Sequence, residues 1–393
     1  MNGMPSIPRL LFALFLVLYA SNEAQAKKPN IILVITDDQG YGPIGRHGHP
    51  WIRTPHLDAL YDTSTRFTRF MVSPTCAPTR AALMTGRHPM KNGVTHTILE
   101  RERMTLKVTT LPQVLKQADY TSGIFGKWHL GNDQAGPLNQ GFDVQVPKWN
   151  GCCPRGGYHP PYKMEGLKIE GKEDEYLTDR LNFMALDFIE QAGEKPFFLY
   201  LSHFSVHDPI QGRKDLVEKY RAKRVKLPPI EVPEFILEGN PDDKNPLSRK
   251  QLTELLGKPS HQGHKVLPQR TIKIKQRQDN IEFAAMVEAV DQSLGRVMKK
   301  LEELGQADNT IVIFASDNGG MSAGNFGNPK RVVRDNQLDW AYATSNLPLR
   351  GAKGWLYEGG IRVPLIISSP NQTKLGTISA APVIGTDIYP TIL

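Results

Sequence analysis

The sequence of 393 residues is poor in cysteine, and it lacks a hydrophobic run long enough to cross a membrane. Its three cysteines are Cys76, Cys152 and Cys153. Adjacent cysteines rarely pair with each other because disulfide geometry needs a larger separation of their Cα atoms. The chain is therefore not a disulfide-held scaffold. No stretch reaches the roughly 18 apolar residues of a transmembrane helix, so we expect no stable membrane span.

Positive charge is not spread along the chain. The net charge is +8, and residues 211–280 contain 16 basic and 9 acidic side chains, so nearly all of the excess lies in one segment. A nucleic-acid-binding surface would distribute Lys and Arg with aromatic residues across a face, and we therefore expect no nucleic-acid partner. The basic run from Arg213 to Lys226 either forms a solvated face or faces an anionic substrate or partner.

The first 26 residues have the pattern of a secretory signal peptide. An apolar run from Leu10 to Ala20 follows Arg9, and small residues at Ala24 and Ala26 form a cleavage pattern. An uncleaved anchor or a buried helix is the alternative interpretation. The mature chain is then expected to span 27–393 and to be secreted or periplasmic, with lysosomal or endoplasmic-reticulum routing if the source is eukaryotic.

The remaining chain alternates apolar, β-branched runs with helical patterns. Buried strands are expected at 31–36, 121–125, 197–202, 310–316 and 363–368. Apolar residues from Phe283 to Leu304 recur at intervals of four and three, which predicts one amphipathic helix ending at Gly305. This alternation predicts an α/β fold with a mostly parallel central sheet sandwiched by helices. Residues 211–278, rich in Pro, Lys and Gln, are expected to be an insertion.

Polar residues follow four of the predicted strands. In open α/β sheets ligands bind at the carboxyl ends of strands, so these residues are expected to converge on one edge. Carboxylates with an amide oxygen favour Ca²⁺, or less strongly Mg²⁺, over zinc. Taken singly, such acidic pairs are more often turns or helix caps. The residues are Asp37 and Asp38, Asp317 and Asn318, His203 and His207, and Lys127 with His129.

The stretch from Cys76 to Arg87 predicts an anion site with a reactive residue. Pro78 is typical of a helix start, which places Cys76 just before a helix N-terminus, where backbone N–H groups and the helix dipole favour negative charge. Arg80 lies on the following turn and is expected to reach the same anion. A buried, inert cysteine is the alternative.

These residues carry a resemblance to a known family. Cys-x-Pro-x-Arg followed by Leu-x-Thr-Gly-Arg is similar to the signature of the type I sulfatases, of the alkaline-phosphatase-like superfamily, in which an enzyme oxidises the cysteine to formylglycine. The similarity extends along almost the whole mature chain. Further matching segments are 29–32 leading to Asp37-Asp38, 126–131, His207-Asp208-Pro209, 316–320, 351–353 and 358–364.

The resemblance implies a metal site and a nucleophile. Asp37, Asp38, Asp317 and Asn318 match the family's metal ligands, usually for Ca²⁺, with oxidised Cys76 completing the set. Hydrated formylglycine is a geminal diol, and one hydroxyl attacks the sulfur of a bound sulfate ester and expels the alcohol. The second hydroxyl then loses a proton and releases sulfate.

The resemblance also implies roles for the surrounding polar residues. Arg80, Lys127 and Lys353 are expected to surround the sulfate oxygens, with both lysines acting on sulfate rather than holding the fold. His129 matches the residue that takes the proton. Lys353 and His207 are candidates for protonating the leaving oxygen, and the choice of His207 over His203 rests on its sequence context.

The expected activity is hydrolysis of sulfate monoesters of a carbohydrate or aryl alcohol, and the expected partners are that substrate and a formylglycine-generating maturation enzyme. The chain stops within the family's match at 387–393, so the small C-terminal subdomain of the family is expected to be absent. Two alternatives stay open. One is a formylglycine-dependent phosphoester or phosphonate hydrolase, and the other is a non-catalytic binder of sulfated glycans.

Overall fold

The computed structural model describes residues 27–97, 99–167, 174–239, 244–245, 247–248, 250–251, 254, 271–323, 342–370 and 376–393. The predicted signal peptide and much of the predicted insertion lie outside these ranges. No helix within the described ranges has the length and apolar character needed to cross a membrane.

A mixed sheet forms the centre of the molecule. Among the described residues it has nine strands in the order β10-β2-β9-β8-β1-β5-β3-β4, with β11 also paired to β2. The strands are β1 (Asn30–Thr36), β2 (Thr65–Met71), β3 (Thr121–Gly126), β4 (Val144–Val146), β5 (Phe197–Ser202), β8 (Thr310–Ser316), β9 (Arg362–Ser368), β10 (Ile378–Ser379) and β11 (Val383–Ile384).

The sheet is mostly parallel, as predicted. Strands β8, β1, β5, β3 and β4 pair in parallel, while β9 pairs antiparallel with both β8 and β2. The carboxyl ends of β1, β3, β5 and β8 therefore lie on one edge. Because β9 runs the opposite way, the residues that precede it return to this same edge.

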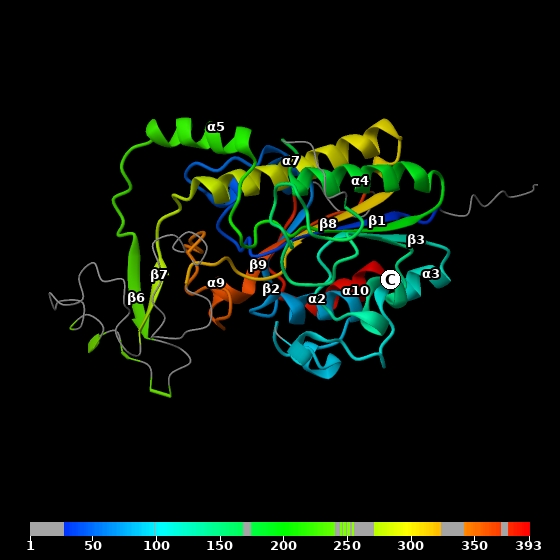
Figure 1. The fold of residues 1–393 in the computed structure, drawn as a ribbon, viewed down its shortest axis with the longest axis horizontal. Helices are drawn as coiled ribbons and strands as arrows, with labels where there is room; N and C mark the ends of the chain where they lie inside the picture. The colour runs from blue at the N-terminus through cyan, green and yellow to red at the C-terminus, as the bar shows by residue number, and fades with distance from the viewer. Residues whose placement is uncertain are drawn as a thin grey trace, which may run out of the picture.

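Helices cover both faces of the sheet, and this confirms the predicted α/β fold (Figure 1). One layer contains α1, α4, α5 and α7, and the other contains α2, α3 and α10. The described helices are α1 (Pro55–Thr63), α2 (Cys76–Thr85), α3 (Leu111–Gln117), α4 (Leu177–Ala192), α5 (Lys214–Val225), α7 (Ile281–Glu303), α9 (Glu358–Ile361) and α10 (Ile388–Ile392), with short 3₁₀ turns η1 (Gly45–His47), η2 (Pro89–Asn92), η3 (Leu99–Glu102), η4 (Asp133–Ala135), η5 (Pro137–Gln140), η7 (Ala307–Asn309) and η9 (Gly385–Asp387).

The central strand β1 shows why both layers are needed. Ile31, Leu33 and Ile35 pack into the core beneath α2, α3 and α10, whereas Ile32 and Val34 pack toward α1, α4 and α7. Successive side chains of a strand point to opposite faces, so a continuous apolar run buries both faces at once. The run that predicted a strand at 31–36 is thus the run that the two layers cover.

The strand and helix boundaries predicted for the core are confirmed within a residue or two. Strands at 197–202 and 310–316 coincide with β5 and β8, and the predicted amphipathic helix is α7. Strand β2, which lies between β9 and the short strands β10 and β11, was not predicted. Its sequence interleaves Arg66 and Arg69 with aromatic residues, and most of its side chains are only half-buried, so it lacks the continuous apolar run of the central strands.

Within the predicted insertion, the described parts form α5 and a separate two-stranded antiparallel pair, β6 (Phe235–Gly239) and β7 (Thr271–Lys275). This pair lies at one end of the molecule near α9 (Figure 1). It is attached there by the Lys275 N–H, which donates to Ser322 O at 2.7 Å, and by an ion pair between Arg350 and Glu238 at 2.6 Å.

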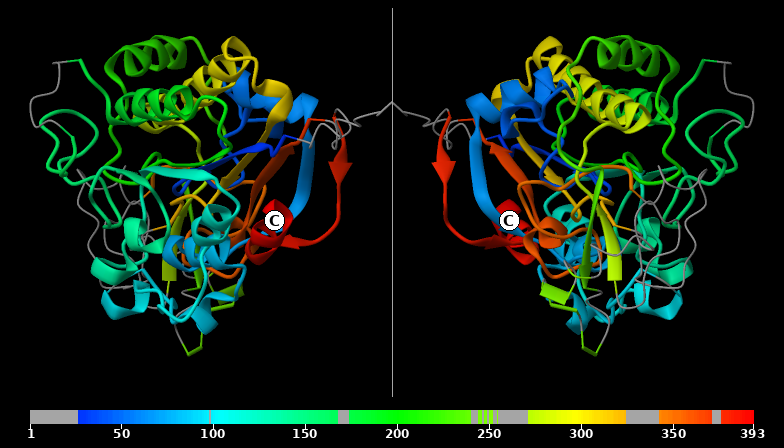
Figure 2. Two further views of the ribbon diagram at one scale, coloured as in Figure 1. Left: turned by 90° about the vertical axis from the view of Figure 1, so that its right-hand side faces the viewer. Right: turned by 90° about the vertical axis from the view of Figure 1, so that its left-hand side faces the viewer.

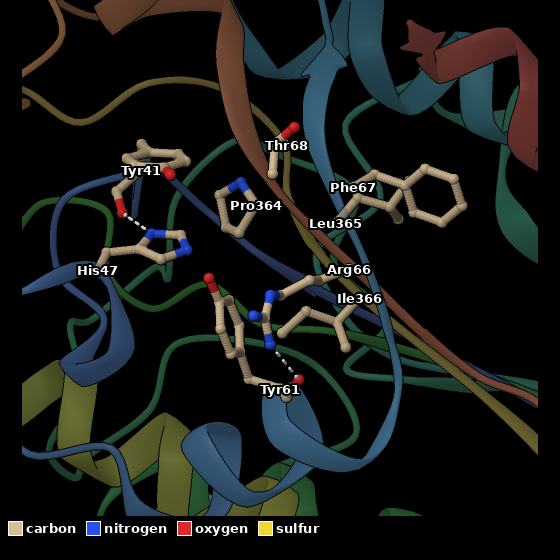
Figure 3. Close-up of a pocket in the computed structure, with 9 residues that line it drawn as sticks. All are labelled: Tyr41, His47, Tyr61, Arg66, Phe67, Thr68, Pro364, Leu365 and Ile366. Carbon is tan, nitrogen blue, oxygen red and sulfur yellow. Dashed lines mark hydrogen bonds between the residues drawn. The ribbon is translucent and has the colours of Figure 1, made fainter. Parts of the chain in front are cut away.

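The central sheet ends at β4 on one side and at β10 on the other. On the β10 side, the last two strands of the chain, β10 and β11, lie beside β2 (Figure 2). A small pocket lies between β2, β9 and the loop after β1 (Figure 3). In it the rings of Tyr41 and His47 stack at 4.0 Å and the guanidinium of Arg66 lies 4.2 Å from the Tyr61 ring centroid. The nine lining residues include no cysteine and no carboxylate, so this pocket lacks the ligand types that the sequence predicts for the site.

Gly126 ends β3 with a positive φ of 117°, and a Cβ at this position would lie 1.8 Å from Ser202 O on β5. Gly305, which follows α7, also has a positive φ (64°), but a Cβ there would meet no atom within 4 Å. We expect Gly305→Ala to lower the free energy of unfolding by about 1–2 kcal/mol, through backbone strain alone. Gly126→Ala should cost clearly more, because strain and a backbone clash add. Urea unfolding of both variants measures the difference, and equal losses would contradict this account of the β3–β5 contact.

Candidate active site

The predicted acidic residues meet at the edge where β1 and β8 end. These strands are neighbours in register, Thr36 facing Ser316, so the residues that follow them are adjacent. The Asp38 N–H donates to Asp317 Oδ1 at 3.2 Å, and Asn318 Nδ2 donates to Asp38 Oδ1 at 2.7 Å. All four predicted metal ligands from these loops are fully buried.

Cys76 reaches this acidic cluster from the other layer. It is the first residue of α2, one position further into the helix than the sequence predicted, and Thr75 is the N-cap. Ligand atoms of Asp37, Cys76 and Asp317 lie within 4.8 Å of one another. The amino end of α2 therefore places residue 76 at the edge of the sheet where the parallel strands end. The helix dipole favours negative charge at this position.

Arg80 lies beneath this cluster and is fully buried. Its Nε and Nη2 both donate to Asp317 Oδ2, at 3.0 and 2.8 Å, and its Nη1 donates to Lys127 O at 3.1 Å. We expected Arg80 to contact an anion. In the structure its guanidinium holds Asp317, as a bidentate donor group can, and the contact with a substrate anion stays a prediction.

The two predicted lysines each form a buried ion pair. Lys127 Nζ lies 2.6 Å from Asp37 Oδ2, and Lys353 Nζ lies 2.8 Å from Asp38 Oδ2. Burial alone would lower the pKa of each lysine, but the negative charges of Asp37 and Asp38 respectively outweigh it and raise both pKa values. Both ammonium groups therefore stay charged, and each also neutralises a carboxylate of the fold, which we did not expect from the sequence.

His129 lies directly against Cys76. Its Nδ1 is 3.4 Å from Cys76 Sγ, and its Nε2 is 3.1 Å from Glu102 Oε2. Burial, and then the positive charge of Lys127, lower the pKa of His129. The imidazole is therefore neutral at physiological pH, which leaves one ring nitrogen free to accept a proton.

Of the two histidines after β5, only His207 joins the cluster. His207 Nε2 lies 3.0 Å from Lys353 Nζ, and His207 Nδ1 lies 2.7 Å from Asp208 Oδ1. Burial and the positive charge of Lys353 lower the pKa of His207, but the negative charges of Asp38 and Asp37 outweigh them and raise this pKa to about 10. His203 contacts Ser293 of α7 at 3.3 Å, and burial lowers its pKa to about 3. The geometry thus agrees with the choice of His207 over His203.

The acidic cluster has the chemistry of a cation site. Asp37 Oδ1 and Asn318 Oδ1 are both buried without a hydrogen-bond partner, although buried polar oxygens are nearly always satisfied. Burial and the neighbouring Asp317 carboxylate raise the pKa of Asp37, and the positive charge of Lys127 opposes this shift. A cation bound to these oxygens would satisfy both atoms and favour the ionised carboxylate. The donor set of carboxylates with one amide oxygen fits a hard divalent ion.

The contact between Glu102 and His129 was not predicted from the sequence. Glu102 belongs to η3 and lies in an alternating run of Glu and Arg, which has the pattern of a solvated surface. No motif or spacing in the sequence places Glu102 beside His129. Cys152 and Cys153 lie in the loop after β4. A hydrogen bond from Cys153, and then the positive charge of Lys127, lower the pKa of Cys152 despite burial.

The fold and this cluster of side chains define a member of the alkaline-phosphatase-like hydrolases. The sulfatase family model matches residues 29–393, and the chain belongs to the sulfatase family.

Individual relatives agree with this family assignment. The chain is 28% identical to arylsulfatase J of Mus musculus over 94% of its own length and 53% of that protein. It is 27% identical to an arylsulfatase of Klebsiella aerogenes over 95% of its length and 87% of that protein. The crystal structure of Ps i-CgsB in complex with k-i-k-neocarrahexaose superimposes with a TM-score of 0.65 and 27% identity, over 93% of this chain and 71% of that chain. The chain thus spans about half the length of the mouse relative.

Removing one acidic ligand should abolish metal binding. In the parent protein, we expect Ca²⁺ at about 100 times its Kd to raise the free energy of unfolding by about 2.7 kcal/mol, measured as the difference between calcium and chelator. Asp317→Ala should lose this increment. Asp291→Asn is the matched control, because Asp291 is also a buried carboxylate but binds the amino end of α1, through the Leu57 N–H at 2.7 Å. An Asp317→Ala protein that keeps the parental calcium effect would rule out this ligand set.

Removing Lys127 should expose the structural part of its role. In chelator, Lys127→Met leaves the Asp37 carboxylate buried without its lysine, a change that typically costs about 3–5 kcal/mol. In saturating Ca²⁺ the loss should be smaller, because the cation balances the same charge. Lys116→Met is the control, since its ion pair with Asp143 is solvent-exposed and contributes about 1 kcal/mol or less. Thermal unfolding of both variants with and without calcium tests this, and a calcium-independent loss for Lys127→Met would contradict it.

Proposed function

We propose that this chain hydrolyses sulfate monoesters, with the side chain at position 76, converted to formylglycine, as the nucleophile. The observation that carries the proposal is the position of Cys76 at the amino end of α2, between the acidic cluster and His129, with its Sγ 3.4 Å from His129 Nδ1. Membership of the sulfatase family supports the same reaction. Hydrated formylglycine would supply a hydroxyl nucleophile at this position.

A divalent cation, Ca²⁺ in preference to Mg²⁺, is proposed at Asp37, Asp38, Asp317, Asn318 and residue 76. The two buried oxygens without partners, Asp37 Oδ1 and Asn318 Oδ1, support this ligand set. When bound, the cation would supply positive charge that polarises the sulfate and makes the nucleophile more acidic. Arg80 holds Asp317 in place through two hydrogen bonds, so its proposed role is to position a ligand as well as to add positive charge.

The remaining side chains are proposed to stabilise negative charge and to transfer protons. Lys127 and Lys353 are charged, buried and fixed before substrate arrives, so they can stabilise negative charge that develops on sulfate oxygens. His129 accepts a proton from residue 76 through Nδ1. Lys353 and His207, in contact with each other at 3.0 Å, form the pair from which the departing alcohol oxygen takes a proton.

The proposed substrate is a sulfated carbohydrate or aryl alcohol. The likeness to the crystal structure of Ps i-CgsB, which holds an oligosaccharide, supports a carbohydrate. A secretory route through the predicted signal peptide, to the outside of the cell, the periplasm or the lysosome, is part of the same proposal. So is a maturation enzyme that acts on the Cys76 motif.

Modification of Cys76 is directly measurable. We expect protein made together with a formylglycine-generating enzyme to show a loss of about 18 Da at residue 76, which is the difference between a thiol and an aldehyde. The peptide containing Cys152 and Cys153 serves as an internal control and should keep its full mass. Paired assays on aryl sulfate and aryl phosphate should then favour sulfate. Active protein with an unmodified thiol would exclude the proposed nucleophile.

The substrate assays separate the alternatives. Preference for phosphate would assign the phosphoester alternative, and binding of sulfated sugars without turnover would assign the glycan-binding alternative.

A further inference from the structure

His129 is held by two polar contacts on opposite sides of its ring. Nδ1 faces Cys76 Sγ at 3.4 Å, and Nε2 faces Glu102 Oε2 at 3.1 Å. The His129 side chain is 1% exposed, whereas that of Glu102 is 29% exposed. Glu102 thus lies between the buried His129 and the protein surface, and its side chain retains contact with water.

The partner at Nε2 determines where the ring proton lies. An ionised carboxylate only accepts hydrogen bonds, so Nε2 must carry the proton and donate it to Glu102. A neutral imidazole has one N–H and one lone pair, and the lone pair is therefore on Nδ1, facing residue 76. With the opposite tautomer, Nδ1 would carry hydrogen and could not accept a proton from that residue.

Main-chain contacts hold the segment of His129 against the loop after β4 and against the segment that follows Glu102. The His129 N–H donates to Asn150 O at 3.1 Å, and Leu130 O accepts from the Met104 N–H at 3.0 Å. His129 has a positive φ of 61°, a conformation that costs a non-glycine residue about 1–2 kcal/mol. Surrounding contacts must offset this strain, and the bond to Glu102 acts on the ring itself.

We propose that Glu102 is a positioning residue that fixes the tautomer and orientation of His129, so that Nδ1 presents its lone pair to residue 76. This inference rests on the proposed function, in which His129 takes a proton from that residue. Among the described residues, no other side chain is within hydrogen-bonding distance of His129 Nε2. Loss of Glu102 therefore leaves the ring free to adopt the opposite tautomer.

The ring nitrogens report this state without any turnover. In full-length protein labelled with ¹⁵N-histidine, the chemical shifts of Nδ1 and Nε2 distinguish the two neutral tautomers, and His129→Asn identifies the signals of His129. We expect the Nε2–H form in the parent and a shift toward Nδ1–H in Glu102→Ala. Glu100→Ala is the matched control, because Glu100 lies on the same 3₁₀ turn but is exposed.

Kinetics supply the second readout. In formylglycine-containing protein, Glu102→Ala should lower kcat by about 10–100-fold, the usual effect of removing a residue that orients a functional histidine, while KM stays unchanged. Glu102→Gln should recover part of kcat, because its amide oxygen can still accept from Nε2. It also carries the test if the alanine variant does not fold.

The outcomes separate this inference from the proposed function. A parental tautomer in Glu102→Ala, or a kcat equal to that of Glu100→Ala, overturns the role of Glu102. A parent protein that does not hydrolyse sulfate esters overturns the proposed function instead, and the tautomer measurement still decides whether Glu102 controls the His129 ring.

Discussion

The site depends on the balance of charge among side chains that are removed from water. Asp37, Asp38 and Asp317 are fully buried on one edge of the sheet, and each is held by a cationic side chain that is also buried. An isolated buried carboxylate would be protonated or would destabilise the fold, so these acids and bases are tolerated only together. Because Arg80, Lys127 and Lys353 come from three separate segments, the same charge balance that permits the cluster also draws those segments to one place.

Strand direction makes this convergence possible. Parallel strands β1, β3, β5 and β8 deliver their following loops to one edge, and the single reversed strand β9 brings the preceding loop with Lys353 to the same edge. Close main-chain contacts then set the loops against each other. A Cβ on Gly319 would lie 1.8 Å from Gly359 O, so the turn after Asp317 can lie against the start of α9 only with glycine there. The loop that contains Asp317 and the loop that contains Lys353 are thereby packed within hydrogen-bonding distance of each other.

Much of this was predictable because it depends on local sequence patterns. Apolar runs specified β1, β5 and β8, and a residue directly after a parallel strand has little freedom in where it lies, so Asp37 and Asp317 could be placed from the sequence. The amino end of α2 was located by Pro78 for a similar reason. The contacts of each cationic side chain could not be predicted. The hydrogen bonds from Arg80 to Asp317 were not predicted, because the sequence shows that a guanidinium is near the site but not which neighbour it faces.

Glu102 marks the limit of what can be predicted from the sequence. It comes from a short 3₁₀ turn whose distance from His129 along the chain is not set by any periodicity, and its neighbours Arg101 and Arg103 suggest a solvated surface. The main-chain contact between Met104 and Leu130 holds the segment after this turn against the segment of the histidine. Residues that follow strands can be placed from the sheet alone, whereas the contact of an orienting residue such as Glu102 depends on tertiary packing. The residues that orient a reacting group are therefore harder to predict from a sequence than the reacting groups themselves, although the tautomer proposed for His129 depends on one of them.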